Sequence, residues 1–337
     1  MTDYDINVND FEFVQKDKVI RDEVYETNSY LRDVFIAFKK NKGAVIGVSF
    51  IVIIALMAIF GPYMNQYQYD QVMIENASLP PLIPAIKNWP IIGNFFNGQM
   101  MGVDMYQARN VETAFWFGTD TLGRDLFTRV WEGTRISLII ALTAVIIDIF
   151  IGMIYGLVSG YFGGKVDFFM QRFAEILYGI PTLVLVTLLS MILPKGIISI
   201  IVALMITGWI GMSRIARAQV LKLKEQEYIL ASKTLGASDF YVIFKEILPN
   251  IFGQIIIMSM FSVPNAIFTE AYLSFVGLGV PAPLASLGSL ISEGYKTITV
   301  YPYMIFFAVF VLGVLMLCFN LFADGLRDAF DPKQKKM

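Results

Sequence analysis

The side chains that most often carry out chemistry in proteins are scarce in this sequence. It has no histidine, and its one cysteine, Cys318, lies within a run of apolar residues. These facts exclude a disulfide within the chain, a metal site built from histidine and cysteine, and a nucleophile activated by histidine. The phosphate-binding pattern G-x-x-x-x-G-K-[ST] is also missing, so we expect no cofactor in this chain and any ATP to be bound by a partner.

One carboxylate is placed where it could act. Asp148 lies half-way along an apolar stretch, where a charge is costly and requires a partner or a polar path. It could line a route for a solute or relay a proton, or it could be a protonated or hydrogen-bonded carboxyl between two helices. We interpret Glu175 and Glu270, near the ends of such stretches, as boundary residues. Carboxylates do not cluster at one depth, so a membrane-embedded enzyme is the weakest hypothesis.

Composition indicates that the elements positioning these groups are membrane helices. Of 337 residues, 56% are hydrophobic and only 16% are charged, against about 25% charged in soluble proteins. The net charge of −2 gives no reason to expect a nucleic-acid partner. We therefore expect an all-α protein that crosses the cell membrane several times. The polar, acidic start argues against a cleaved signal peptide, and residues 1–28 are expected to be mobile.

Six apolar segments have the length needed to cross a hydrocarbon core of about 30 Å. They are residues 43–63, 136–160, 173–193, 196–212, 251–268 and 303–322. Pro181 and Pro264 fall inside two of these spans and could kink them. Four glycines are expected to let helices pack closely: Gly152, Gly156, Gly208 and Gly211.

The distribution of positive charge predicts the orientation of the chain. Six spans place both termini on one side, and that side holds 19 of the 26 Lys and Arg residues, against seven on the other. Both termini are therefore predicted to be cytoplasmic. The resulting division is a cytoplasmic segment 1–42, a first span 43–63, an external region 64–135, a core of five spans 136–325 and a cytoplasmic tail 326–337.

Two regions outside the spans have patterns of their own. From Tyr30 to Phe38 apolar residues recur at helical spacing and lysines follow, which predicts a helix on the inner membrane surface; a plain basic flank is the alternative. The external residues 64–115 contain four prolines and no clear periodicity. The aromatic side chains there and just beyond would rest on the outer interface or touch an external partner: Trp89, Phe95, Phe96 and Trp116.

A long polar interruption, residues 214–250, separates the fourth and fifth spans. Short helical patterns lie on both sides of Gly236, and a glycine between two such runs predicts a helix–turn–helix. Pro249 is expected to end this run before the fifth span. The hairpin of residues 230–249 has the shape needed to pass motion from a soluble partner to membrane helices; an ordinary connector is the alternative.

This hairpin resembles the EAA loop of ABC-importer permeases, which has an EAA-like triplet, then a glycine and a closing Leu-Pro. The matching residues are Leu230, Ala231, Ser232, Gly236, Leu248 and Pro249. Leu230 stands where the family often has Glu, and Glu246 stands where it has Ile. In that family the turn contacts an ATPase, which implies a coupling role for Leu235, Gly236, Ala237, Ser238 and Asp239.

A second resemblance precedes the second span. Seven residues match the G-T-D-x-L-G-R-D signature of permeases that import peptides or nickel: Gly118, Thr119, Asp120, Leu122, Gly123, Arg124 and Asp125. The residues that follow predict an interfacial helix with Arg124, Asp125 and Arg129 on its polar face, opposite Leu122. The segment from Gly160 to Gly164, with Val166 and Asp167, also resembles the first cytoplasmic loop of this family.

Together the resemblances cover residues 30–330 and imply the C-type subunit of oligopeptide and dipeptide importers, with the type I ABC importer permease fold. They imply a second homologous permease, two ATPase subunits that hold ATP and Mg, and an external substrate-binding protein that delivers a short peptide. ATP-driven closure would switch the path by alternating access. A nickel importer permease of the same family, and a stand-alone ion-coupled carrier using Asp148, are the alternatives; the lack of histidine favours peptides over nickel.

Overall fold

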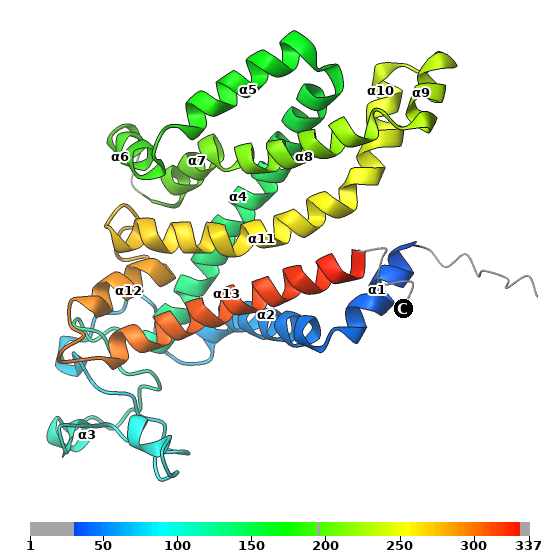
Figure 1. Cartoon of the computed structure of the whole chain (residues 1–337). Coiled ribbons are helices and arrows are strands. Elements are labelled where there is room, and N and C mark those ends of the chain that lie inside the picture. Colours follow the sequence, from blue (N-terminus) through cyan, green and yellow to red (C-terminus); the bar gives the residue numbers. More distant parts are fainter. Residues whose placement is uncertain (1–29, 194–195, 331–337) are drawn as a thin grey trace, which may run out of the picture.

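In the computed structural model of the chain, the described residues are 30–193 and 196–330, and nearly all of their regular structure is helical (Figure 1). Five helical segments are long and apolar enough to cross a membrane, and a bent pair of helices provides a sixth. The prediction of an all-α protein with six spans is therefore confirmed. The segment predicted to be mobile, residues 1–28, lies outside the described residues.

The helices follow one another with short connections. The first half contains α1 (Tyr30–Lys40), α2 (Lys42–Phe60), the 3-10 turn η2 (Gly61–Tyr63), α4 (Leu126–Phe162), α5 (Gly164–Tyr178) and α6 (Thr182–Ile192). The second half contains α7 (Ile197–Thr207), α8 (Trp209–Leu223), α9 (Glu227–Thr234), α10 (Asp239–Tyr241), the π-helical η5 (Val242–Ile247), α11 (Leu248–Phe275), α12 (Leu287–Tyr295) and α13 (Tyr303–Phe330).

The third predicted span, residues 173–193, is not a single helix. α5 and α6 meet at an angle of 79°, and Pro181 precedes α6 at the break. Proline lacks the N–H that would continue the helix and restricts the residue before it, so α5 ends and the chain changes direction. The second span also begins earlier than predicted, because α4 runs without a break from Leu126 and includes the expected interfacial helix.

α4 packs closely along α8. Gly152, Gly156 and Gly160 follow at four-residue steps and face that helix; a Cβ at Gly152 would lie 2.6 Å from the carbonyl oxygen of Trp209. Because no side chain fits there, the two backbones can approach each other, as predicted for Gly152 and Gly156. Gly211 differs, since a Cβ there would meet nothing within 4 Å.

The outer end of α2 is joined to α4 by an arginine. Pro62 has no N–H, so the carbonyl of Ala58 has no partner one turn along its own helix. The Nε of Arg135 donates to this carbonyl at 3.0 Å. Gly61 lies against Trp131 of α4, where a Cβ would come within 2.7 Å of the indole. The proline that ends the span thus also specifies where α4 is attached.

The region between α2 and α4 is folded rather than a structureless loop. It contains η3 (Ile74–Asn76), η4 (Gly93–Phe95), an antiparallel pair of short strands β1 (Gln99–Met100) and β2 (Val103–Asp104), and α3 (Met105–Ala108). The ring of Phe95 lies 5.0 Å from that of Phe306, and Phe96 lies 6.0 Å from Phe307. These two aromatic residues therefore pack on α13 of their own chain, which neither sequence-based interpretation anticipated; Trp89 is exposed.

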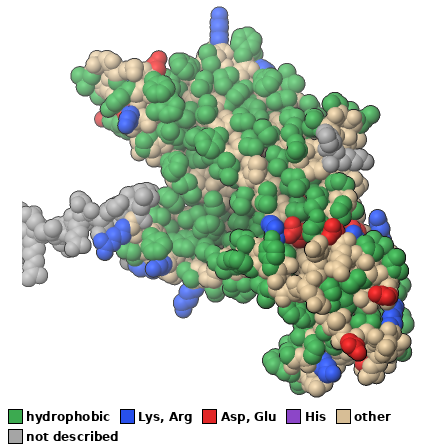
Figure 2. All heavy atoms as spheres, turned by 180° about the vertical axis from the view of Figure 1, so that it is seen from behind, with side chains coloured by type: hydrophobic (Ala, Val, Ile, Leu, Met, Phe, Trp, Pro, Cys, Tyr) green, Lys and Arg blue, Asp and Glu red, His purple; other side chains and the backbone are tan. Residues whose placement is uncertain are grey.

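The helix ends are sorted between the two ends of the bundle. Figure 1 shows α1, the end of α13 and the α9–α10 hairpin together at one end, and α3 and α12 at the other. α1 packs against α13, where the rings of Phe38 and Phe322 are 5.7 Å apart. Figure 2 shows a broad apolar surface between the two ends, with the charged side chains mostly at its margins. This distribution is typical of a chain surrounded by lipid.

Candidate functional site

The hairpin between α8 and α11 has the helix–turn–helix form expected from Gly236. α9 ends at Thr234, and Gly236 adopts a φ of +91°, a backbone conformation that glycine takes without strain. The N–H of Ala237 donates to the carbonyl of Ser232 at 3.1 Å, and the Ser238 hydroxyl accepts from the Tyr241 N–H at the start of α10. Each residue type in the turn is thus explained by the backbone it must support.

One face of the hairpin is buried and the other is exposed and apolar. Ile229, Val242 and Ile247 are completely buried against α4 and α8. Leu235 at the turn is 89% exposed and Phe240 is 71% exposed, and a Cβ on Gly236 would meet nothing within 4 Å. We call the exposed apolar residues at this end of the molecule the turn surface: Leu230, Leu235, Phe240, Tyr241 and Phe244. Exposed apolar groups gathered at one place indicate a contact site.

Pro249 does not end the hairpin, contrary to the prediction. The helical run continues from Asp239 to Phe275 through the π-helical turn η5. Pro249 lies in the first turn of α11, where the missing N–H would otherwise break the α-helical pattern. A π turn shifts the hydrogen bonds by one residue and so lets the chain pass the proline without a break. The second arm of the hairpin and the fifth span are therefore one continuous element.

The two arms of the hairpin are linked by a pair that the sequence comparison marked as unusual. The hydroxyl of Ser232 on α9 donates to Glu246 Oε1 on η5. Ser232 is the last residue of the triplet, and Glu246 is the residue found in place of isoleucine. The carboxylate at position 246 thus binds the triplet from the opposite arm, while Leu230, in place of the frequent glutamate, is exposed.

The signature before α4 forms a tight loop around one carboxylate. Gly118 and Gly123 have φ values of +77° and +78°, which explains the glycine at both positions. Asp120 Oδ1 accepts from the N–H groups of Leu122 and Arg124 at 2.8 and 2.9 Å. The hydroxyl of the fully buried Thr119 accepts from the Leu79 N–H at 2.8 Å. The signature is thus an ordered turn at the end of the molecule opposite the hairpin.

The signature ends in a residue that begins α4. Asp125 is the N-cap of that helix, and its Oδ2 accepts from the N–H and the hydroxyl of Thr128 at 2.8 and 2.6 Å and from Asn65 at 2.8 Å. Burial raises the pKa of the Asp125 carboxyl above its usual range, although the hydrogen bonds from Thr128 and Asn65 act in the opposite direction. The side chain therefore determines where α4 starts.

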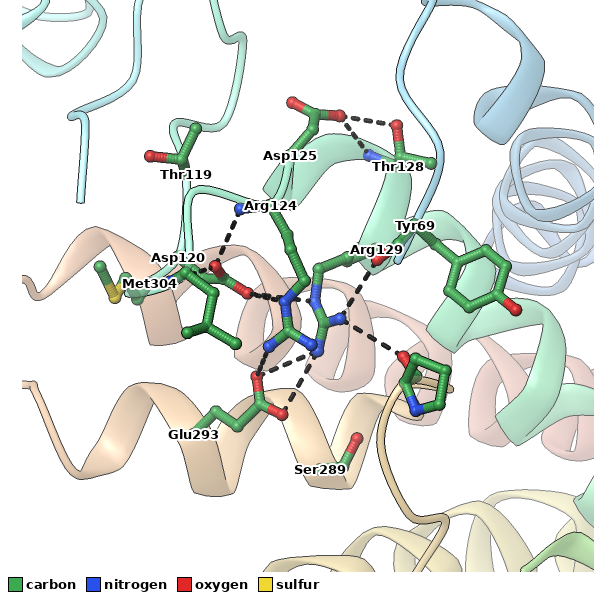
Figure 3. Close-up of polar contacts among 12 residues, drawn as sticks. Tyr69, Thr119, Asp120, Arg124, Asp125, Thr128, Arg129, Ser289, Glu293 and Met304 are labelled. Atoms are coloured by element: carbon green, nitrogen blue, oxygen red, sulfur yellow. Dashed lines mark hydrogen bonds and ion pairs between the residues drawn. The ribbon is translucent and has the colours of Figure 1, made fainter. Parts of the chain in front are cut away.

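Four charged residues meet beside this loop in a buried group, which we call the outer charge cluster: Asp120, Arg124, Arg129 and Glu293 (Figure 3). Arg124 Nε lies 2.6 Å from Asp120 Oδ2, and Arg129 Nη2 lies 3.0 Å from Glu293 Oε2. Arg129 is fully buried and also donates to the carbonyl oxygen of Tyr69 at 3.2 Å. The cluster joins the signature loop and α4 to α12.

The sequence pattern assigned these residues to the wrong environment. Arg124, Asp125 and Arg129 were expected on an exposed polar face, but they are at most 6% exposed, whereas Leu122 is 44% exposed. An amphipathic pattern shows that two faces differ and not which of them is covered. Glu293 was missed altogether; its signal is that it is the one charged residue between Glu270 and Lys296, in a region facing several arginines.

Two carboxyl groups within the spans have different surroundings. Asp148 is half-buried, its Oδ1 has no hydrogen-bond partner among the described residues, and its carboxylate lies where a Cβ on Gly208 would be, at 2.6 Å. Glu270 is fully buried and accepts from Ser137 at 2.6 Å and Ser274 at 2.7 Å. Glu270 is therefore a helix-contact residue and not the boundary residue that its position suggested.

Comparison with known proteins places this fold. The chain is similar to a structure of the MetNI methionine ABC transporter in inward-facing conformations, with a TM-score of 0.51 and 17% identity over 60% of this chain and 97% of that one. The profile described as "Binding-protein-dependent transport system inner membrane component" matches residues 149–336, and that of the "N-terminal TM domain of oligopeptide transport permease C" matches residues 29–81. The fold is thus that of an ABC importer permease.

The chain belongs to the family of binding-protein-dependent transport system inner membrane components. It is 45% identical to the oligopeptide transport system permease protein OppC of Bacillus subtilis, with 91% of both chains covered. It is 42% identical to the dipeptide transport system permease protein DppC of the same organism, covering 91% of this chain and 87% of that one. The Escherichia coli OppC is 36% identical, over 92% of this chain. The resemblance to oligopeptide and dipeptide permeases is confirmed, and the chain is a multi-pass membrane protein.

Proposed function

We propose that this chain is the C-type permease subunit of an ATP-driven importer of short peptides. The relatives named for oligopeptide and dipeptide transport cover at least 87% of their own length and about nine-tenths of this chain, so the likeness extends over the whole transport unit. A nickel importer of the same family is the less favoured substrate assignment. The chain forms the translocation path together with a second, homologous permease.

The proposal orients the chain with both termini and the hairpin in the cytoplasm. Two observations support it: 19 of 26 positive residues belong to that side, and the hairpin, α1 and the end of α13 lie at the same end of the bundle (Figure 1). In this arrangement residues 1–42, 214–250 and 326–337 are cytoplasmic. The folded region 64–125, including the signature, faces outward, where an external substrate-binding protein delivers the peptide.

The observation that carries the proposal is the turn surface. An 89% exposed leucine beside an uncovered glycine would be costly in water, and a soluble partner that buries it gains apolar contact area. The proposed partner is one of two ATPase subunits, which hold ATP and Mg. Its contacts are the turn residues Leu235 to Asp239, and the triplet and Leu248-Pro249 shape the two arms that present them.

The continuous helix from Asp239 to Phe275 gives a physical route for coupling. A displacement of the turn by the ATPase acts directly on the fifth span, because no loop separates them. At the far end of this helix, Glu270 binds Ser274 and Ser137, and Ser274 accepts from Ser286, the N-cap of α12. Switching a population from 1:99 to 99:1 requires about 5.5 kcal/mol of differential binding, and ATP-driven closure of the ATPases would supply it.

Uptake measurements test the proposed function. Cells or vesicles that contain the complete system should accumulate a labelled short peptide, and accumulation should persist with an uncoupler when ATP is maintained. Peptide uptake that stops with the uncoupler while ATP stays high would support an ion-coupled carrier instead. Uptake of nickel, but not of peptide, would assign the chain to the nickel branch. A membrane with an inactivated ATPase gene is the control, since it should show no uptake under either condition.

A further inference from the structure

The inner end of α4 carries a buried tyrosine that contacts both arms of the hairpin. Tyr161 is the penultimate residue of α4 and is 6% exposed. Its hydroxyl donates to Asp239 Oδ1 at 2.5 Å, and Asp239 is the first residue of α10. The ammonium group of Lys233, on α9, lies 4.3 Å from the centre of the Tyr161 ring. One side chain of α4 is therefore bound by polar contacts from each side of the turn.

The end of α4 that carries this tyrosine is itself tied to its neighbours. Arg217 of α8 binds Asp167 of α5 through two contacts of 2.6 Å. Asp167 also accepts from Ser159 of α4, and Lys224 donates to the carbonyl of Gly160 at 3.0 Å. The inner ends of α4, α5 and α8 thus form one connected block. All of these contacts involve the Gly160–Asp167 segment or the residue preceding it.

The other contacts of the hairpin with this block are apolar. Ile229, Val242 and Ile243 pack against Leu157 and the α8 side chains, and such contacts are non-directional, so they resist separation more than sliding. The hydrogen bond from Tyr161 is directional and ends on a charged acceptor, which makes it stronger than a bond between neutral groups. It therefore holds the turn in register with α4.

We propose that Tyr161 is a positioning residue that makes movement of the hairpin move α4. This inference rests on the proposed function, since it assumes that an ATPase displaces the turn. α4 extends from Tyr161 to Arg129 in the outer charge cluster. Displacement of the turn then reaches the outer end by two helices, α11 directly and α4 through Tyr161. Without the tyrosine hydroxyl, the hairpin still binds the ATPase but slides on α4.

The test is Tyr161→Phe, which removes the hydroxyl and keeps the ring. The matched control is Tyr155→Phe on the same helix, because the Tyr155 hydroxyl donates to the carbonyl of Met170 on α5 and not to the hairpin. In the reconstituted importer, two quantities are measured: the amount of ATPase that co-purifies, and the ATP hydrolysed per peptide imported. We expect both variants to retain the ATPase and Tyr161→Phe to raise the ATP spent per peptide about tenfold, the effect of losing a bond to a charged group.

A second variant separates the hydrogen bond from other effects of the tyrosine. Asp239→Ala should raise the same ratio, and the double variant Tyr161→Phe with Asp239→Ala should be no worse than either single change. The inference is overturned if Tyr161→Phe and Tyr155→Phe give the same ratio, if the two effects add in full, or if Tyr161→Phe loses the ATPase. Failure of the wild-type complex to bind any ATPase would instead refute the proposed function.

Discussion

Removal of Arg129 is the sharpest test of the outer charge cluster. Arg129→Met keeps most of the apolar stem and deletes a fully buried guanidinium that contacts Asp120, Glu293 and the carbonyl of Tyr69. Breaking a buried ion pair by removing one partner costs about 3–5 kcal/mol. Here the lower value is expected, since the Glu293 side chain is 40% exposed and can be hydrated, and Asp120 keeps Arg124.

The assay is thermal unfolding of the purified chain in detergent at a fixed scan rate, because unfolding of such proteins is often irreversible. A loss of about 3 kcal/mol should lower the apparent midpoint by about 6 °C. The control is Arg172→Met, which breaks a pair with Glu175 whose side chains are 64% and 52% exposed; it should cost less than about 1 kcal/mol.

The compensating variant decides whether charge is the cause. Arg129→Met leaves the cluster with one positive and two negative groups, and adding Glu293→Gln restores neutrality. The double variant should therefore be more stable than Arg129→Met alone. Equal midpoints for Arg129→Met and Arg172→Met, or a further loss on adding Glu293→Gln, would refute the reasoning that the four residues act as one buried group.

Three further predictions concern the interior of the bundle. Gly156→Leu should sharply reduce the yield of folded protein, because a Cβ there would lie 2.6 Å from that of Ala216, whereas Gly211→Leu, in open space, should not. Asp148→Asn should leave peptide uptake within about twofold, because ATP drives transport; a loss of more than tenfold would favour the carrier hypothesis. Glu270→Leu should lower the unfolding midpoint by several degrees relative to Glu270→Gln, since leucine leaves buried serine hydroxyls without an acceptor; similar midpoints would contradict that role.

Sequence patterns predicted the features of this protein that depend on local residues. The spans follow from apolar length, and the turn follows from a glycine whose neighbours form helices on both sides. Gly152 and Gly156 could be assigned to close packing because their four-residue spacing puts them on one face. Each of these inferences needs only the residues within two or three helical turns.

The features that sequence reasoning missed depend on contacts between distant residues. Arg129 and Glu293 are separated by 164 positions, and nothing local shows that both are buried. Glu270 looked like a boundary residue because its serine partners come from α4 and from its own helix. Pro249 was expected to break the chain, and the π turn that accommodates it has no sequence signal that we recognised. Tertiary packing decided all of these cases.

Co-purification is the measurement that tests the central claim most directly. The chain is solubilised gently from its native membrane, as wild type and with Gly236→Ala or Gly236→Arg. Both substitutions strain a residue with φ of +91°, but only arginine adds bulk and charge at the tip of the turn. We expect a second permease and ATPases with the wild type and with Gly236→Ala, and the permease without ATPases for Gly236→Arg. A wild-type chain that purifies alone, or a Gly236→Arg variant that keeps its ATPases in full, would contradict the account.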